Sequence, residues 1–136
     1  MKFKNNPLNI RWSQSNNWVG QIQPKRGFCQ FSELHYGFRA VLRLLYRYRQ
    51  LGVVTVSDVI SRFAPNSENN TQAYINSVCV NGHFRPDEEV TFDFPCLVKL
   101  ICSMYVVEQP ECMSPFDLSI LLDTIVEFLK SIKHES

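Results

Sequence analysis

The residue of most chemical interest is Glu108, which directly follows an apolar segment at residues 97–107. We predict a buried helix for that segment, so the carboxylate would stand at a helix C-terminus beside an apolar wall. Burial and the negative end of the helix dipole both raise the pKa of a carboxyl group. A glutamic acid that stays protonated near neutral pH suits general acid catalysis, whereas an ordinary solvated glutamate is the alternative interpretation.

A second candidate carboxylate, Glu68, begins the run Glu-Asn-Asn-Thr, and Tyr74 lies shortly after that run. The asparagines and the threonine can cap a helix that follows, and the dipole of that helix would lower the pKa of Glu68. Glu68 would therefore suit water activation or electrostatic stabilisation better than proton donation. Asn69 and Tyr74 could line a ligand cleft, or the run could serve only to cap the helix and fix the loop.

A third group of polar and aromatic residues could bind a ligand, and its members are grouped by the family resemblance given in the next paragraph rather than by nearness in the sequence. Asn9 and Arg11 carry donors suited to carboxylate and acetamido groups, and Trp18 offers a flat face on which a sugar ring can stack. Arg39 could join this group, or it could be a buried tie between the N-terminal loop and the following helix. Trp18 could equally belong to a small local core.

The order of these residues resembles a family of small phage and prophage proteins described as structural protein P5-like and lysozyme-like. The pattern reads Asn-Pro-x-Asn-Ile-Arg from Asn6, Trp-x-Gly from Trp18, Gly-x-Arg-Ala from Gly37, and Ala-Pro-x-x-Glu-Asn-x-Thr-x-x-Tyr from Ala64. The match is close between residues 6 and 74 and loose beyond them. It implies a lysozyme-like fold that cleaves the glycan strands of peptidoglycan.

Such a fold places its acid at the end of a central helix, which implies Glu108 as the proton donor. Family members usually continue Asn-Gly after this glutamate, where this chain has Gln109 and Pro110. The bond cut would be the β-1,4 linkage between N-acetylmuramic acid and N-acetylglucosamine. Cleavage would proceed through water activated by Glu68, or through attack by the muramyl hydroxyl as in lytic transglycosylases. The implied glycan-binding residues are Asn6, Asn9, Arg11, Trp18, Arg39, Asn69 and Tyr74.

The resemblance also implies a phage or prophage context, with virion proteins as partners beside the glycan strands. The alternative function is that of a virion component, or an inhibitor-like binding module, which keeps the fold and has lost catalysis. We find no secretory signal and no apolar run of the roughly 20 residues that span a bilayer. We therefore expect synthesis in the cytoplasm, followed by association with the virion or release to the cell wall.

Size and charge exclude several other classes. The 136 residues are predicted to form one domain, residues 1–136, with a net charge of +1 that does not favour nucleic acid as a partner. Arg39, Arg43 and Arg47 nevertheless lie four residues apart, so they share one helix face. That face could bind a polyanion, although a solvated helix side is the simpler interpretation.

The five cysteines contain no Cys-x-x-Cys pair, which favours free thiols over a disulfide framework or a metal site. Cys79 and His83 have ligand-like spacing, with Cys29 and His35 as conceivable partners, but a second tight pair is missing. We expect no metal and no cofactor. A Cys–His amidase built from these residues is a further alternative, and the common serine-hydrolase, phosphate-loop and zinc-protease motifs are absent.

The elements that must position these residues are mainly helical. Residues 1–33 are rich in Asn, Gln, Ser, Gly and Pro, which indicates a loop or β-hairpin region. Apolar spacing and capping residues then predict helices. They run from Leu34 to a stop at Gly52, from Ser57 to Phe63 with Thr55 or Ser57 as N-cap, from Asn70 or Thr71 to a break at Asn81 and Gly82, over residues 97–107, and from Pro115 to Ile132 with Ser114 as N-cap.

Overall fold

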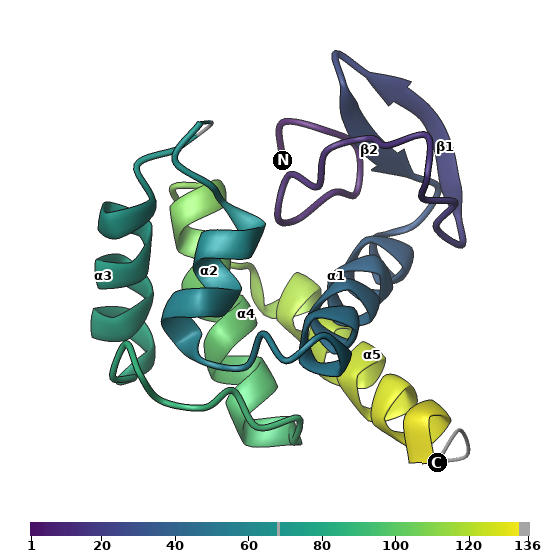
Figure 1. The fold of residues 1–136 in the computed structure, drawn as a ribbon. Helices are drawn as coiled ribbons and strands as arrows, with labels where there is room; N and C mark the ends of the chain where they lie inside the picture. Colours follow the sequence, from purple (N-terminus) through teal and green to yellow (C-terminus); the bar gives the residue numbers. More distant parts are fainter. Residues whose placement is uncertain (68, 134–136) are drawn as a thin grey trace.

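The computed structural model describes residues 1–67 and 69–133. Within these residues, five helices follow a two-stranded sheet (Figure 1). The elements are β1 (Gln21–Lys25), β2 (Phe28–Phe31), α1 (Leu34–Gln50), α2 (Val56–Phe63), α3 (Thr71–Gly82), α4 (Phe94–Glu108) and α5 (Pro115–Lys133). The predicted helix-rich class with an N-terminal hairpin is confirmed. The lysozyme-like fold stays a prediction.

The hairpin gives the N-terminal segment a surface to pack on. β1 and β2 pair antiparallel through a turn at Arg26 and Gly27, whose φ angles of 51° and 82° are both left-handed. Two such residues match the twist of the flanking strands, and glycine adopts this conformation without strain. The segment before β1 then runs beside β2, where the Cys29 amide donates to the Ile10 carbonyl at 2.9 Å.

Side-chain caps start four of the helices. The capping oxygens accept from the backbone N–H three residues further on, and they belong to Thr55, Asn70, Asp93 and Ser114. For α2 the cap is thus the earlier of the two predicted candidates. α4 begins at Phe94, ahead of the predicted start, because Asp93 and the proline after Phe94 both favour a helix N-terminus there.

The end of α3 differs from the prediction. Gly82 is the last helical residue rather than a break, and His83 ends the helix with a left-handed φ of 56°. Gly82 is buried, and a Cβ placed on it would clash with the ring of Phe84 and with Ser103 of α4. The glycine therefore serves close packing between α3 and α4.

One apolar core joins the elements. α3 packs on α4 and on α2, while α5 packs on both α1 and α4 (Figure 1). One face of α4 is fully buried, with no exposed surface on Leu97, Leu100, Ile101 or Met104. Burial of this face removes apolar surface from water and anchors α4 in the core. None of the described helices is both long and apolar enough to cross a membrane.

Candidate functional site

Glu108 is the last residue of α4, and its side chain meets two distant parts of the chain. The Tyr74 hydroxyl, from α3, donates to Glu108 Oε2 at 2.9 Å. Asn9 Nδ2, from the N-terminal loop, donates to Oε1 at 3.0 Å and to the Glu108 carbonyl at 3.2 Å. The half-buried carboxylate is therefore held at both oxygens.

Asn6 shapes the loop that carries Asn9. Its side chain has no exposed surface, and its Oδ1 accepts from the Ile10 amide at 2.9 Å. Its Nδ2 donates to the carbonyls of Ile10 and Cys29, at 3.0 and 2.8 Å. Asn9 itself adopts a left-handed φ of 52°, which asparagine tolerates better than most residues. Asn6 therefore bonds to the backbone and does not line the cavity described below, and its contact with a substrate stays a prediction.

Gln109, the residue after Glu108, was not recognised as part of a site from the sequence. Its buried side-chain amide donates to the Pro7 carbonyl at 3.1 Å, to the Asn6 carbonyl at 3.4 Å and to Asn9 Oδ1 at 3.2 Å. Because Asn9 Oδ1 is taken by this bond, its Nδ2 must face Glu108. Gln109, which departs from the pattern expected from the resemblance, thus adds to the bonds from Asn9 that tie the N-terminal loop to the end of α4.

The electrostatics of Glu108 combine opposing effects. Burial raises the pKa of its carboxyl group, and this exceeds the lowering by the hydrogen bonds from Asn9 and Tyr74 and by the charge of Lys2. Burial likewise raises the pKa of Tyr74 well above its ordinary value, with the charge and hydrogen bond of Glu108 adding to the rise. Tyr74 therefore stays a protonated donor over the physiological pH range.

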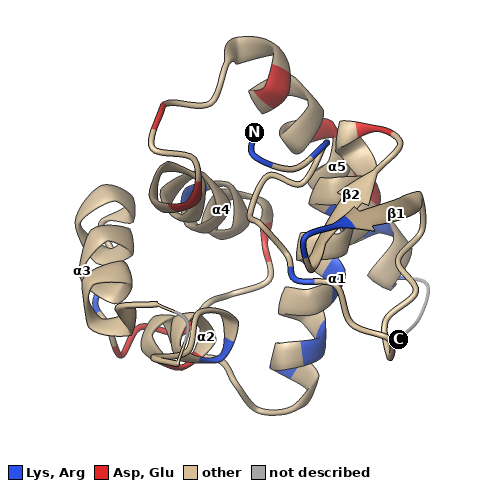
Figure 2. Ribbon diagram, turned by 90° about the horizontal axis from the view of Figure 1, so that it is seen from above, with Lys and Arg blue, Asp and Glu red and all other residues tan. Residues whose placement is uncertain are grey.

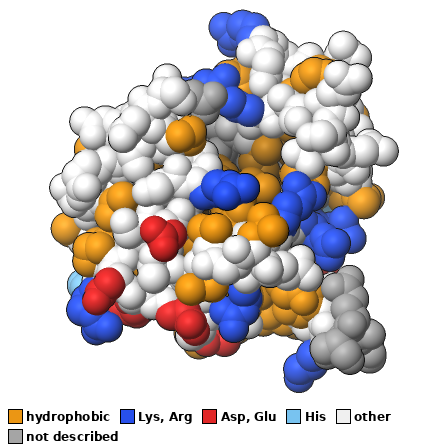
Figure 3. All heavy atoms as spheres, in the orientation of Figure 1, with side chains coloured by type: hydrophobic (Ala, Val, Ile, Leu, Met, Phe, Trp, Pro, Cys, Tyr) orange, Lys and Arg blue, Asp and Glu red, His pale blue; other side chains and the backbone are white. Residues whose placement is uncertain are grey.

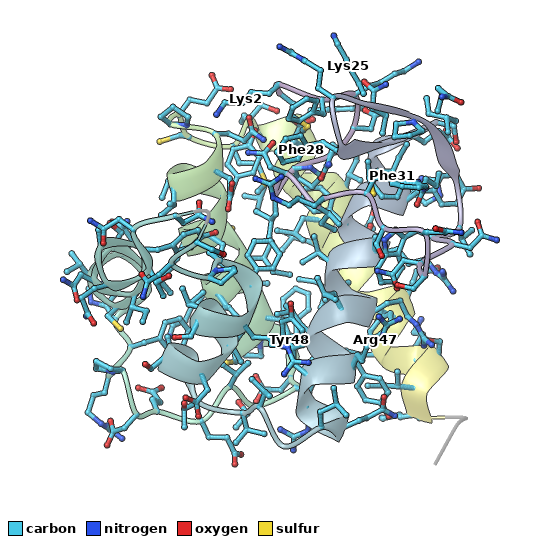
Figure 4. All side chains as sticks on the ribbon, turned by 45° about the horizontal axis from the view of Figure 1, so that its top comes forward. Lys2, Lys25, Phe28, Phe31, Arg47 and Tyr48 are labelled. Atoms are coloured by element: carbon cyan, nitrogen blue, oxygen red, sulfur yellow. The ribbon has the colours of Figure 1, made fainter. Side chains whose placement is uncertain are left out.

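Glu108 faces a cavity of about 400 Å³ between the N-terminal loop, α1 and α2. Figure 3 shows a hollow with hydrophobic side chains inside it and Lys or Arg side chains at its edge. In Figure 4, Tyr48 lies between α1 and α2, with Phe28 and Lys2 on the side of the N-terminal segment. We call this space the Glu108 cavity. The residues that line it include Lys2, Asn9, Arg11, Asn16, Trp18, Phe28, Tyr48, Asn69 and Glu108.

The cavity offers three kinds of contact to a ligand. Aromatic rings come from Trp18, Phe28 and Tyr48, amides from three asparagines, and positive charge from Lys2 and Arg11. The Arg11 guanidinium stacks over the Phe28 ring at 4.7 Å, which orients it. Trp18 is only 9% exposed, and its indole N–H has no hydrogen-bond partner among the described residues. It contributes a wall more than an open stacking face.

The structure brings most of the predicted site residues together. Asn9, Arg11, Trp18 and Asn69 line the Glu108 cavity with Glu108, and the Tyr74 hydroxyl binds its carboxylate. Lys2, Asn16, Phe28 and Tyr48 also line it, although no spacing in the sequence indicated them.

Glu68 and Arg39 were also predicted as site residues. Glu68 lies outside the described residues. Arg39 is half-buried, and it lines two other cavities instead of the Glu108 cavity. Across residues 1–67 and 69–133 we see no hydrogen bond or ion pair from Arg39, so the predicted buried tie to the N-terminal loop is not found there.

The thiols show no sign of catalytic activation. All five cysteines are free, and burial raises the pKa of Cys29 to about 11 and also raises that of Cys79. A raised pKa keeps a thiol protonated and therefore less nucleophilic, which argues against the Cys–His amidase. No group of three or more His, Cys, Asp or Glu side chains in the described part of the chain is arranged to hold a metal ion.

Comparison with known proteins gives one phage relative. Over 79 residues the chain is 35% identical to Protein P5 of Pseudoalteromonas phage PM2, an alignment that covers 54% of this chain and 49% of that protein. The chain thus spans about half the length of the curated relative it matches. No protein-family model matches the chain. The similarity to a phage protein is supported, whereas the lysozyme-like relationship stays a prediction.

Proposed function

We propose that this chain cleaves the glycan strands of peptidoglycan at the β-1,4 linkage between N-acetylmuramic acid and N-acetylglucosamine. The observation that carries the proposal is the half-buried Glu108 carboxyl group, whose pKa is raised and which faces a ligand-sized cavity. The volume falls within the roughly 300–1,000 Å³ typical of ligand sites. The amides suit acetamido groups, and Lys2 and Arg11 suit the carboxylate of the muramyl lactyl group.

In the proposed reaction, protonated Glu108 transfers its proton to the glycosidic oxygen as the bond from that oxygen to the muramyl ring breaks. The developing positive charge on the ring is then quenched by an oxygen nucleophile, whose own proton returns to Glu108. Among the described residues, Glu108 is the sole carboxylate that lines the cavity. The nucleophile is either the muramyl hydroxyl, which needs one carboxyl group to act first as acid and then as base, or water activated by a second carboxylate such as Glu68, which lies outside the described residues.

Binding without cleavage is the second candidate function. The hydrogen bonds from Asn9 and Tyr74 both favour the ionised form of Glu108, which cannot donate a proton. In such a module the same cavity would hold a glycan strand and leave it intact. The similarity to a phage protein fits either role, and we propose a phage-encoded protein that meets the cell wall as part of the virion or after release.

Digestion of purified sacculi, followed by mass analysis of the products, tests the proposal. We expect glycan cleavage by the parent, with an anhydro-muramyl end if the muramyl hydroxyl attacks and a reducing end if water attacks. Glu108→Gln should lower the cleavage rate at least about a hundredfold, the usual contribution of a general acid. Glu111→Gln is the matched control, because this nearby carboxylate is exposed and does not line the cavity. Glycan binding with no cleavage by the parent would instead establish the binding module, and equal rates for the parent and Glu108→Gln would remove Glu108 from the mechanism.

A further inference from the structure

A second cavity adjoins the Glu108 cavity and is strongly basic. Its volume is about 360 Å³, and it lies between α1 and the loop before β1. We call it the arginine cavity, because three arginines of α1 line it, namely Arg39, Arg43 and Arg47. The rest of its lining is the loop segment of residues 15–19. Figure 2 shows Lys or Arg on successive turns of α1. No acidic residue of the described chain lines this space.

The loop before β1 turns one helix face into an open concavity. Residues four apart on a helix lie on one side, at a rise of about 6 Å for each such step. Arg43 stacks over the Phe128 ring of α5 at 5.9 Å, which holds the middle of the row against the protein. Arg47 Nη1 donates to Asn16 Oδ1 at 3.0 Å and stacks over Trp18 at 5.3 Å. The face expected from sequence to be an ordinary solvated helix side therefore forms one wall of an open, cationic concavity.

The two cavities share a wall. Asn16 and Trp18 line both of them, and both residues contact Arg47. Figure 4 shows Arg47 and its neighbour Tyr48 on different sides of α1, one toward each space. The two cavities therefore lie next to each other, and a ligand that occupied both would lie across Asn16 and Trp18.

We propose that the arginine cavity binds carboxylates of the stem peptide attached to the muramyl residue, so that the chain acts on peptide-substituted glycan in preference to bare glycan. This inference rests on the proposed function. Guanidinium groups bind planar carboxylates in a bidentate manner, and the amides of Asn16 and Asn17 can hydrogen-bond a peptide backbone. A concavity of about 360 Å³ on a chain of net charge +1 fits a short acidic peptide better than a long nucleic acid, which binds along an extended basic surface.

Calorimetric titration of the full-length chain tests the inference. The probes are a neutral N-acetylglucosamine tetramer, a disaccharide carrying a tetrapeptide stem, the free tetrapeptide, and inorganic phosphate at matched ionic strength. We expect the disaccharide-peptide to bind at least about tenfold more tightly than the neutral tetramer, as one bidentate ion pair would give. That gain should disappear in Arg39→Gln and in Arg43→Gln. It should persist in Arg85→Gln, which removes an exposed arginine far from this cavity.

The outcomes separate this inference from the proposed function. Binding of the free tetrapeptide that needs Arg39 would support the arginine cavity even if no glycan is cleaved. Equal affinity for the peptide-bearing and peptide-free probes would overturn it even if Glu108→Gln abolishes cleavage. Tighter binding of phosphate or of a DNA oligonucleotide than of the stem peptide, through the same arginines, would also overturn it. Circular dichroism melts of Arg39→Gln and Arg43→Gln check that both variants fold. We expect both to fold, because a half-buried arginine that lines a cavity tolerates replacement by glutamine.

Discussion

Replacement of Asn6 by alanine tests whether this residue organises the N-terminal loop or contacts a ligand. Alanine removes the bond that the Ile10 amide donates to Oδ1, and the two bonds that Nδ2 donates to the Ile10 and Cys29 carbonyls. The Ile10 carbonyl keeps its bond from the Cys29 amide, but the Ile10 amide loses the partner shown here. The substitution therefore leaves polar backbone groups buried with fewer partners.

The magnitude follows from these three bonds. A typical buried hydrogen bond contributes about 1 kcal/mol net, so Asn6→Ala should lower the free energy of unfolding by about 3 kcal/mol. For a domain of 136 residues this corresponds to a fall of about 10 °C in melting temperature. Asn9 should lose its left-handed conformation in part of the population, since the turn that carries it is loosened.

Thermal and urea denaturation followed by circular dichroism measure this change directly. Asn17→Ala is the control, because this asparagine is exposed and should change the melting temperature by less than about 2 °C. A parent-like melt for Asn6→Ala, combined with a loss of glycan binding, would show that Asn6 contacts the ligand and that the reasoning from its hydrogen bonds is wrong.

Three further changes test other parts of the structure. Burial raises the pKa of Glu108 above its ordinary 4.5, so the folded chain binds this proton more tightly than the unfolded chain does. The free energy of unfolding from urea melts should therefore fall as pH rises from about 4.5 through the folded pKa. Glu108→Gln should flatten this dependence on pH. Tyr74→Phe removes a hydrogen bond that lowers the pKa of Glu108, so the fall in unfolding free energy should extend to higher pH. The unfolding free energy itself should drop by about 1 kcal/mol. An unchanged pH range for this fall would contradict the assigned hydrogen bond. Gly37→Ala places a methyl group against the Asn5 carbonyl and the Pro7 ring, and a soluble variant with a parent-like melt would contradict this packing.

The helices could be predicted because their signals are local. Thr55 and Ser114 cap α2 and α5 as expected, and an apolar stripe runs along α5. The start of α4 was placed too late because Asp93 belongs to a polar stretch that has no periodic pattern. Its capping role becomes visible only when the backbone of residues 93–96 is in place. Caps embedded in loops are therefore the weak point of such predictions.

The candidate site was predictable only in part, because most of its contacts join residues that lie far apart in the sequence. The position of Glu108 at the end of a buried helix is a local feature. Its bond to Asn9 spans 99 residues and its bond to Tyr74 spans 34, and no periodicity reports on contacts at such separations. Both partners entered the prediction through the family pattern. Gln109 was read as a departure from that pattern, whereas its buried side chain, beside the half-buried Glu108, connects the end of α4 to the N-terminal loop.

The hydrogen-bond network also determines which oxygen of Glu108 carries the proton. Asn9 can offer only its Nδ2 to Oε1, because its Oδ1 already accepts from Gln109. Oε1 must therefore stay an acceptor in both protonation states. The Tyr74 hydroxyl can reverse its role, donating to an ionised Oε2 or accepting from a protonated one. A proton on Oε2 would therefore lie between Glu108 and the Tyr74 hydroxyl, so its transfer to a glycosidic oxygen requires this hydrogen bond to break. A ligand that fills the cavity and excludes water would raise the pKa of Glu108 further and so favour the protonated form that the proposed reaction needs.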